Sequence, residues 1–149
     1  MPFGTGAGPA VWCHAMLPDY HAFSGRGGYA FPLFDRRPEV NDSNISAALV
    51  EGISAAYGEH MHAVDLFDAI LCLLSATSYS LRFAEDLEDV FPHVPFPAQR
   101  ATFEDAVRVG RAIRGVESFA REPSERYRSV EFARGHSTAW RGSAGAICR

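Results

Sequence analysis

The sequence predicts a mainly α-helical domain of about four helices with a short N-terminal strand or hairpin. Between residues 44 and 116, apolar side chains recur every three to four positions in several separate segments, which is the period of amphipathic helices. One earlier stretch, GYAFPLFDRR at 28–37, is instead rich in aromatic and aliphatic residues typical of a strand. We therefore expect an irregular segment over 1–27, the helical domain over 28–120, and a poorly ordered, polar and Gly-rich tail over 121–149.

The strand and the first helix are justified by their breakers and caps. Pro32 cannot donate to a strand ladder, so the strand at 28–37 should lie at an edge, and RRPEVNDSN after it should form a turn. The first helix should begin near Asn44, a good N-cap residue, and stop at Gly58. Its expected buried face is formed by Ile45, Leu49, Ile53 and Ala56.

The second helix, over about 64–75, is apolar on nearly every side and should be the buried central helix. Asp65 and Asp68 lie near its start, where the helix dipole favours acidic side chains. The same two carboxylates, one helical turn apart, would also fit an acid–base or metal pair.

A third helix is expected over about 78–90 and a fourth over about 98–116. The connecting segment holds prolines at 92, 95 and 97, and residues that precede proline are driven to extended conformations. Phe91, Val94 and Phe96 should press this segment onto the second and fourth helices.

Composition and charge exclude several classes of function for this chain. The chain has 149 residues, 47% of them hydrophobic, and a net charge of −4, so as a whole it is not a basic nucleic-acid binder. Every basic residue is Arg, and charge is uneven: residues 43–97 sum to −7 and residues 98–149 to +4. Three separated cysteines with no CxxC spacing fit a reduced, cytoplasmic setting, and no apolar run approaches the ~20 residues of a membrane span.

Catalytic and metal motifs are weak. FGTGAG at 3–8 has no preceding strand to make a nucleotide loop, and without Lys no Walker motif exists. His60, His62 and Asp65 would suit a small zinc hydrolase, but a third strong ligand is missing by spacing, so a solvated linker is favoured. We expect no catalytic residues, no metal and no cofactor.

Residues 64–96 nevertheless carry a recognisable pattern, DLFDAILCLLSATSYSLRFAEDLEDVFPHVPF. It resembles a signature of the type ISP restriction–modification enzymes, in which an aliphatic helix end leads through a Tyr to Arg-aromatic-Ala-Glu and a Phe-Pro-x-aliphatic-Pro run. The matching positions are Leu74, Tyr79, Arg82, Phe83, Ala84, Glu85, Leu87, Phe91, Pro92, Val94 and Pro95. GYAFPLFDRR with NDSNIS upstream and FEDAVRVGRAI downstream are similar to flanking blocks of the family, so the resemblance covers about residues 18–118.

The resemblance implies the C-terminal specificity region, which recognises the DNA target for an adenine methyltransferase in chains that also hold a nuclease and a helicase-like motor. Those parts have no counterpart here, so a fragment or detached module is expected. The family's His-Ser-Pro is replaced by Ser75, Ala76 and Thr77, an Arg by Ser80, and a basic residue by His93. Residues after about 121 have no expected family counterpart.

Duplex DNA is the expected partner, bound weakly by this chain alone because its acidic middle repels phosphates. The methyltransferase and helicase parts of the same system are further possible partners. Arg offers a planar fork for phosphates and guanine edges, and an Asn and a Tyr lie in the matching blocks. The candidate DNA-binding residues are Arg36, Arg37, Asn44, Tyr79, Arg82, Arg100, Arg108 and Arg111.

Two alternatives stay open beside DNA recognition. One is a helical interaction module that docks on a methyltransferase subunit through its acidic helices, and the other is a non-functional gene remnant. A DNA module predicts arginines on one face beside the strand at 29–34. A docking module predicts an apolar patch rimmed by acids, and a remnant predicts large exposed apolar surfaces.

Overall fold

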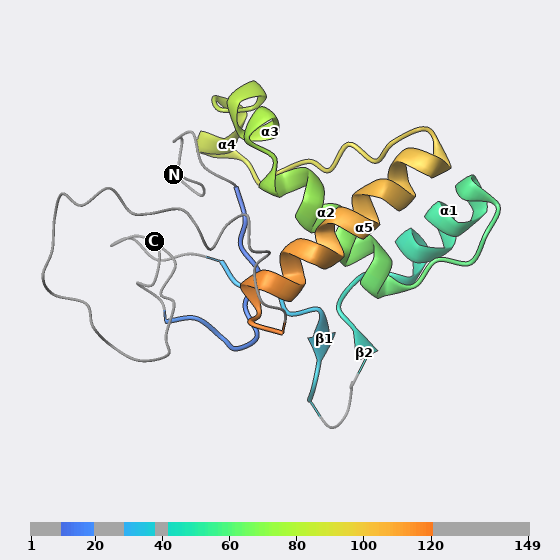
Figure 1. Cartoon of the computed structure of the whole chain (residues 1–149), viewed down its shortest axis with the longest axis horizontal. Coiled ribbons are helices and arrows are strands. Elements are labelled where there is room, and N and C mark those ends of the chain that lie inside the picture. Colours follow the sequence, from blue (N-terminus) through green and yellow to red (C-terminus); the bar gives the residue numbers. More distant parts are fainter. Residues whose placement is uncertain (1–9, 20–28, 38–41, 121–149) are drawn as a thin grey trace, which may run out of the picture.

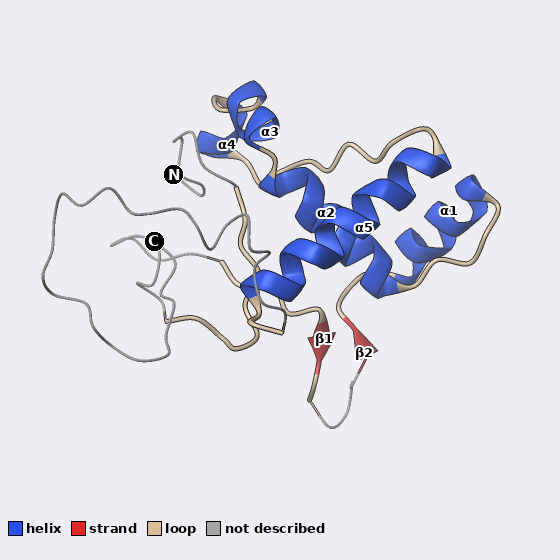
Figure 2. Cartoon of the chain, in the orientation of Figure 1, coloured by secondary structure: helices blue, strands red, loops and turns tan. Residues whose placement is uncertain are grey.

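Helices make up most of the described chain, which in this computed structural model comprises residues 10–19, 29–37 and 42–120. The elements in chain order are β1 (Phe34–Asp35), β2 (Asp42–Ser43), α1 (Ala47–Tyr57), α2 (Ala63–Ser75), α3 (Thr77–Arg82), α4 (Asp86–Asp89) and α5 (Arg100–Glu117) (Figures 1 and 2). The prediction of a mainly α fold with a short hairpin is confirmed.

The hairpin is shorter than the predicted strand. β1 pairs antiparallel with β2, with Phe34 opposite Ser43 and Asp35 opposite Asp42. One further bond, from the Asn44 N–H to the Leu33 carbonyl at 2.9 Å, extends the pairing toward α1. Part of the segment expected to be a turn therefore forms the second strand.

α2 and α5 cross at the centre of the helical part (Figure 1). Their backbones approach most closely at Gly110, where an added Cβ would lie 1.7 Å from the Asp68 carbonyl oxygen. The first core cluster lies along this contact, with Leu66 and Ala69 of α2 packed against Phe103 of α5. The central position predicted for the second helix is confirmed.

The buried face of α1 differs from the prediction. The helix begins after Ser46 rather than Asn44, and Gly58 ends it in the left-handed conformation. Ile45 and Ile53 pack on the core as predicted, but Leu49 and Ala56 are exposed, and Val50 and Tyr57 complete the buried face. With a 3.6-residue period, the apolar face from Val50 passes through Ile53 to Tyr57, whose ring contacts Phe103 at 4.8 Å between centroids.

The predicted third helix is wrong as a single element, because the chain breaks at 83–85 into α3 and α4. Acidic residues dominate positions 85–89 and would face the negative end of the dipole in one long helix. A new helix starting at Asp86 places that acid in its first turn instead. Leu87 of α4 still reaches the second core cluster, beside Leu74 and Tyr79.

The proline-rich segment docks with two of its three predicted side chains. Val94 packs on the second core cluster, and Phe96 packs on the first, 6.3 Å from the Phe103 ring. The prediction for Phe91 is wrong: its ring lies against Tyr29 and is 47% exposed. In an extended chain alternate residues share a side, so 94 and 96 face the core while 91 faces away.

Residues 10–13 form no helix or strand, yet they are held against α2 and α5. The Ala10 N–H donates to the Leu74 carbonyl at 3.1 Å, and the Cys13 N–H donates to Glu117 Oε2 at 2.5 Å. Both Ala10 and Cys13 are buried. The motif at 3–8 and the tail from 121 lie outside the described residues. No helix within the described ranges is long and apolar enough to cross a membrane.

Candidate nucleic-acid interface

Two adjacent arginines follow β1, and their side chains have different partners. The Arg36 guanidinium lies over the Phe34 ring, 4.8 Å from its centroid. Arg37 forms a fork on Asp35, with Nε at 3.0 Å from both oxygens and Nη2 at 2.6 Å from Oδ2. Both contacts span two residues, which share one side of an extended chain. Arg37 lowers the pKa of the Asp35 carboxyl by hydrogen bonding, whereas Arg36 forms no ion pair within the described ranges.

The α5 arginines are engaged by carboxylates at the surface. Arg100 pairs with Glu59, and its Nε lies 2.7 Å from Glu104 Oε1. Arg108 pairs with Asp105 at 2.9 Å, and these two side chains are 73% and 71% exposed. Exposed pairs of this kind contribute about 0–1 kcal/mol, so a phosphate can replace the carboxylate at little cost.

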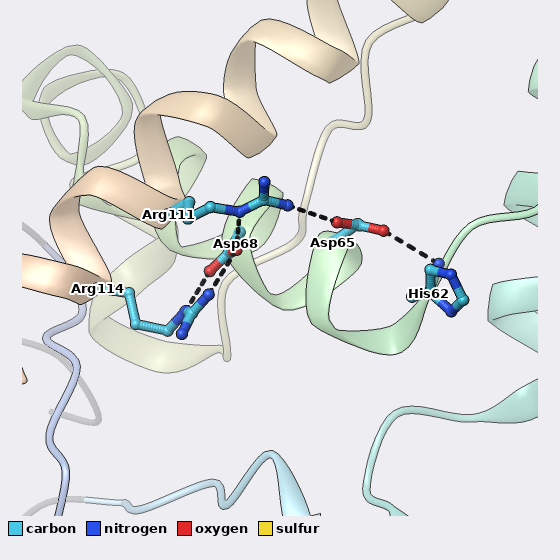
Figure 3. A network of polar contacts seen from close by, with 5 residues as sticks. All are labelled: His62, Asp65, Asp68, Arg111 and Arg114. Carbon is cyan, nitrogen blue, oxygen red and sulfur yellow. Dashed lines mark hydrogen bonds and ion pairs between the residues drawn. The ribbon is translucent and has the colours of Figure 1, made fainter. Parts of the chain in front are cut away.

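A polar network joins α5 to a fully buried carboxylate on α2 (Figure 3). Arg114 approaches Asp68 with two bonds, Nε to Oδ1 at 2.6 Å and Nη2 to Oδ2 at 3.0 Å. Arg111 lies between two carboxylates, with Nε at 3.5 Å from Asp68 Oδ2 and Nη2 at 2.9 Å from Asp65 Oδ1. The second oxygen of Asp65 accepts the backbone N–H of His62 at 3.2 Å.

This network gives Asp65 and Asp68 a structural role that the sequence prediction missed. Asp68 is 0% exposed, so its charge is stable there only with opposite charge and hydrogen bonds around it. Its hydrogen bonds raise the pKa of the Arg114 guanidinium. The acids are three residues apart on α2, and Arg111 and Arg114 are three residues apart on α5, but this match is informative only once the two helices are known to pack together.

The remaining candidates are on or near other elements. Tyr79 of α3 is buried, and its O–H donates to the His93 carbonyl at 2.8 Å. Arg82, at the end of α3, is exposed, with its guanidinium 5.7 Å from the Phe83 ring centroid. Asn44 is exposed and directly follows β2.

The structure thus brings the candidates together in separate groups rather than in one cluster. Arg36, Arg37 and Asn44 share the hairpin. The three candidate arginines of α5, at 100, 108 and 111, lie within an arc of about 80° on one helical face. α3 lies at the opposite side of the helical part from the hairpin (Figure 1).

A family model described as the type ISP C-terminal specificity domain matches residues 2–138. The chain belongs to this family. Membership implies a role in DNA target recognition within a restriction–modification system. Comparisons with curated proteins and with solved structures gave no match.

The match corrects one expectation about the extent of the specificity domain. The resemblance predicted from the motifs covered about residues 18–118, and residues after 121 were expected to have no counterpart. The family match continues to residue 138, so that expectation is wrong for 122–138. The polar, Gly-rich composition beyond 121 offered no apolar period by which to relate it to the family.

The proposed zinc ligands do not converge in the described part of the chain, where no three His, Cys, Asp or Glu side chains are placed to hold a metal ion. The His60 and His62 rings stack edge to face with centroids 4.8 Å apart. One oxygen of Asp65 accepts a hydrogen bond from Arg111, and the other accepts the backbone N–H of His62 at the start of α2. The geometry therefore gives no support to the hydrolase alternative.

Proposed function

We propose that this specificity domain recognises the DNA target of a restriction–modification adenine methyltransferase system and has no catalysis of its own. The observation that carries the proposal is the family match over residues 2–138. The chain acts as a module whose chemistry is supplied by methyltransferase and helicase parts of the same system, in the bacterial cytoplasm. We propose residues 28–120 as its helical unit; Ala10 and Cys13 are hydrogen-bonded to α2 and α5 of this unit.

The hairpin is the element proposed to contact base edges. The major groove of duplex DNA admits a two-stranded ribbon, and Arg is the commonest partner of guanine there. The Arg36 guanidinium is not neutralised by any carboxylate within the described ranges. Its stacking on Phe34 restricts the side chain before binding, so less conformational entropy is lost when it contacts DNA. The exposed amide of Asn44 has the donor and acceptor that pair with adenine.

Three arginines of α5, Arg100, Arg108 and Arg111, are proposed to contact phosphates. Their side chains are 45–73% exposed, so their exchange of a carboxylate for a phosphate requires no unfolding. The neighbouring carboxylates, including Glu104 and Asp105, lower the local positive charge. Binding by this chain alone should therefore be weak and strongly salt-dependent.

The test is fluorescence anisotropy of the full chain with random duplex DNA at about 50 and 200 mM salt. Arg36→Ala and Arg37→Ala together should weaken binding at the lower salt, and Arg108→Ala should reduce the salt dependence. Arg82→Ala is the comparison for Arg108→Ala, because each removes one positive charge; an equal effect of Arg82→Ala would place a DNA contact at the end of α3 as well. No binding by a folded, monodisperse sample would refute autonomous DNA recognition.

A second experiment separates base recognition from charge alone. The wild-type chain is used to enrich duplexes from a random library, and the enriched duplexes are tested with Arg36→Ala and Arg36→Lys. Loss of a bidentate guanine contact should remove the preference for guanine at one position, because a correct pair contributes about 1–3 kcal/mol of discrimination. Equal weakening on every sequence would instead indicate that Arg36 contacts phosphate.

A further inference from the structure

Three aromatic rings form a cluster at the surface, outside both core clusters of the described residues. Phe91 contacts Tyr29 with centroids 4.9 Å apart and planes at 70°, and contacts Phe31 at 6.0 Å and 81°. Edge-to-face pairs at these distances are mutually attractive. Tyr29, Phe31 and Phe91 nevertheless remain 65%, 64% and 47% exposed, and Val90 beside them is 44% exposed. We name these four residues the aromatic patch.

Acidic side chains adjoin the aromatic patch along the chain. α4 (Asp86–Asp89) ends directly before Val90, and the sequence carries acids at 85, 86, 88 and 89. Glu85 and Asp86 are exposed and form no ion pair within the described part of the chain. By contrast, Glu59, Asp65 and Asp68 are each paired with an α5 arginine.

The unpaired acids beside the aromatic patch indicate the charge of the molecule that covers it. Duplex DNA is disfavoured as its occupant because the unpaired carboxylates of Glu85 and Asp86 repel phosphates. An apolar centre with a charged rim is the usual composition of a protein-binding surface, and aromatic residues are enriched at such centres. A rim of one sign selects a partner of the opposite sign and steers its approach.

We propose that the aromatic patch and α4 form a docking surface for a basic protein segment. The partner inserts an apolar side chain against Phe31 and Phe91 and places Arg or Lys beside Glu85 and Asp86. This surface involves neither Arg36 nor the α5 arginines, so it is separate from the DNA contacts proposed above. It allows the specificity domain to hold a protein partner and DNA at the same time.

The test uses the full chain and short fluorescent peptides of designed composition. One peptide combines Arg with Leu and Phe, a second keeps the Arg but replaces Leu and Phe with Ser, and a third keeps the apolar residues but replaces Arg with Glu. Saturable binding is expected for the basic apolar peptide alone, with an affinity that falls as salt rises. Equal binding of the acidic apolar peptide would overturn the proposal, since the α4 carboxylates would then play no part.

Variants locate the peptide on the surface. Phe31→Ser should weaken the basic apolar peptide at least about tenfold, as expected for loss of an aromatic anchor at an interface. Leu49→Ser is the matched control, because Leu49 is also exposed but lies on α1, away from α4 (Figure 1). Glu85→Gln with Asp86→Asn keeps the apolar patch and should reduce both affinity and salt dependence. Unchanged affinity in both the Phe31 and the charge variants would overturn the proposal.

Other occupants give distinct results. If two copies of the chain pair through the patch, sedimentation velocity will show a dimer that Phe31→Ser dissociates, and the basic-partner proposal fails. If Phe31→Ser abolishes duplex DNA binding, the patch belongs to the DNA interface and the proposal also fails. Loss of DNA binding in Arg36→Ala with unchanged peptide binding supports two separate surfaces. Thermal unfolding of each variant confirms that its fold is retained.

Discussion

Replacing Arg114 by methionine tests whether the buried ion pair fixes α5 on α2. Asp68 is 0% exposed, and Arg114 supplies two of its hydrogen bonds, at 2.6 and 3.0 Å. Methionine keeps an apolar stem of similar length but leaves the carboxylate without these bonds. Removing one partner of a buried pair typically costs about 3–5 kcal/mol, because the other charge stays uncompensated.

The value expected here is near the lower end of that range. Arg111 Nε already lies 3.5 Å from Asp68 Oδ2, and its side chain is 59% exposed, so it can move closer. We therefore expect a loss of about 3 kcal/mol in the free energy of unfolding. Since a domain of this size is stable by about 5–15 kcal/mol, the variant should unfold at a much lower urea concentration.

The assay is urea unfolding followed by circular dichroism, with two comparison variants. Arg108→Met removes an exposed pair and should cost less than about 1 kcal/mol. Asp68→Asn combined with Arg114→Met removes both charges, so it should recover part of the loss. If Arg114→Met is as stable as Arg108→Met, the ion pair does not hold the helices together and the reasoning is refuted.

Three further changes test single contacts. Gly110→Ala should destabilise by about 1–3 kcal/mol or more, because the new Cβ meets the α2 backbone, and a raised melting temperature would contradict this. Burial raises the pKa of Glu117 above 4.5 although the Cys13 N–H opposes this shift, so the native state binds the proton more tightly than the unfolded state. The resulting stability is present below pH 4.5 and is lost as pH rises through the raised pKa. Glu117→Gln should lack this decline in urea titrations between about pH 4 and pH 7, and a parallel decline would contradict the assignment. Tyr79→Phe should cost about 1–2 kcal/mol by leaving the His93 carbonyl unpaired. The motif placed Tyr79 among the candidate DNA contacts, but because its side chain is buried, duplex DNA binding measured by anisotropy should stay unchanged.

Local pattern predicted the elements of this fold better than their faces. The second and last helices were predicted almost to their ends, because their apolar period and the adjacent prolines are local signals. On the predicted face of α1, Ile45 and Ile53 pack on the core, but Val50 and Tyr57 replace Leu49 and Ala56, because packing against Phe103 selects between neighbouring apolar positions. The break between α3 and α4 depends on how four clustered acids meet a helix dipole, which apolar periodicity does not report.

In the candidate site, the sequence indicated which residues matter but not which side chains they bond. The sequence pointed to arginines as contacts, but their carboxylate partners come from elsewhere in the fold. Arg114 and Asp68 are 46 positions apart, and no local pattern predicts that their side chains meet. Tyr79 was selected by motif resemblance, and its hydrogen bond to His93 crosses from α3 to the proline-rich segment. These partners depend on how α2, α3 and α5 pack, which a single sequence does not specify by spacing.

The pairing of the acids explains how an acidic chain can serve in DNA recognition. The middle third sums to −7, but Glu59, Asp65 and Asp68 are neutralised by α5 arginines, so its charge is concentrated toward α4. Phosphates are then repelled mainly from the α3–α4 end, while the hairpin lies on the opposite side (Figure 1). A basic partner that covers α4 removes the remaining repulsion. Partner docking should therefore strengthen DNA binding without adding any contact to DNA, because the two events are linked through one electrostatic field.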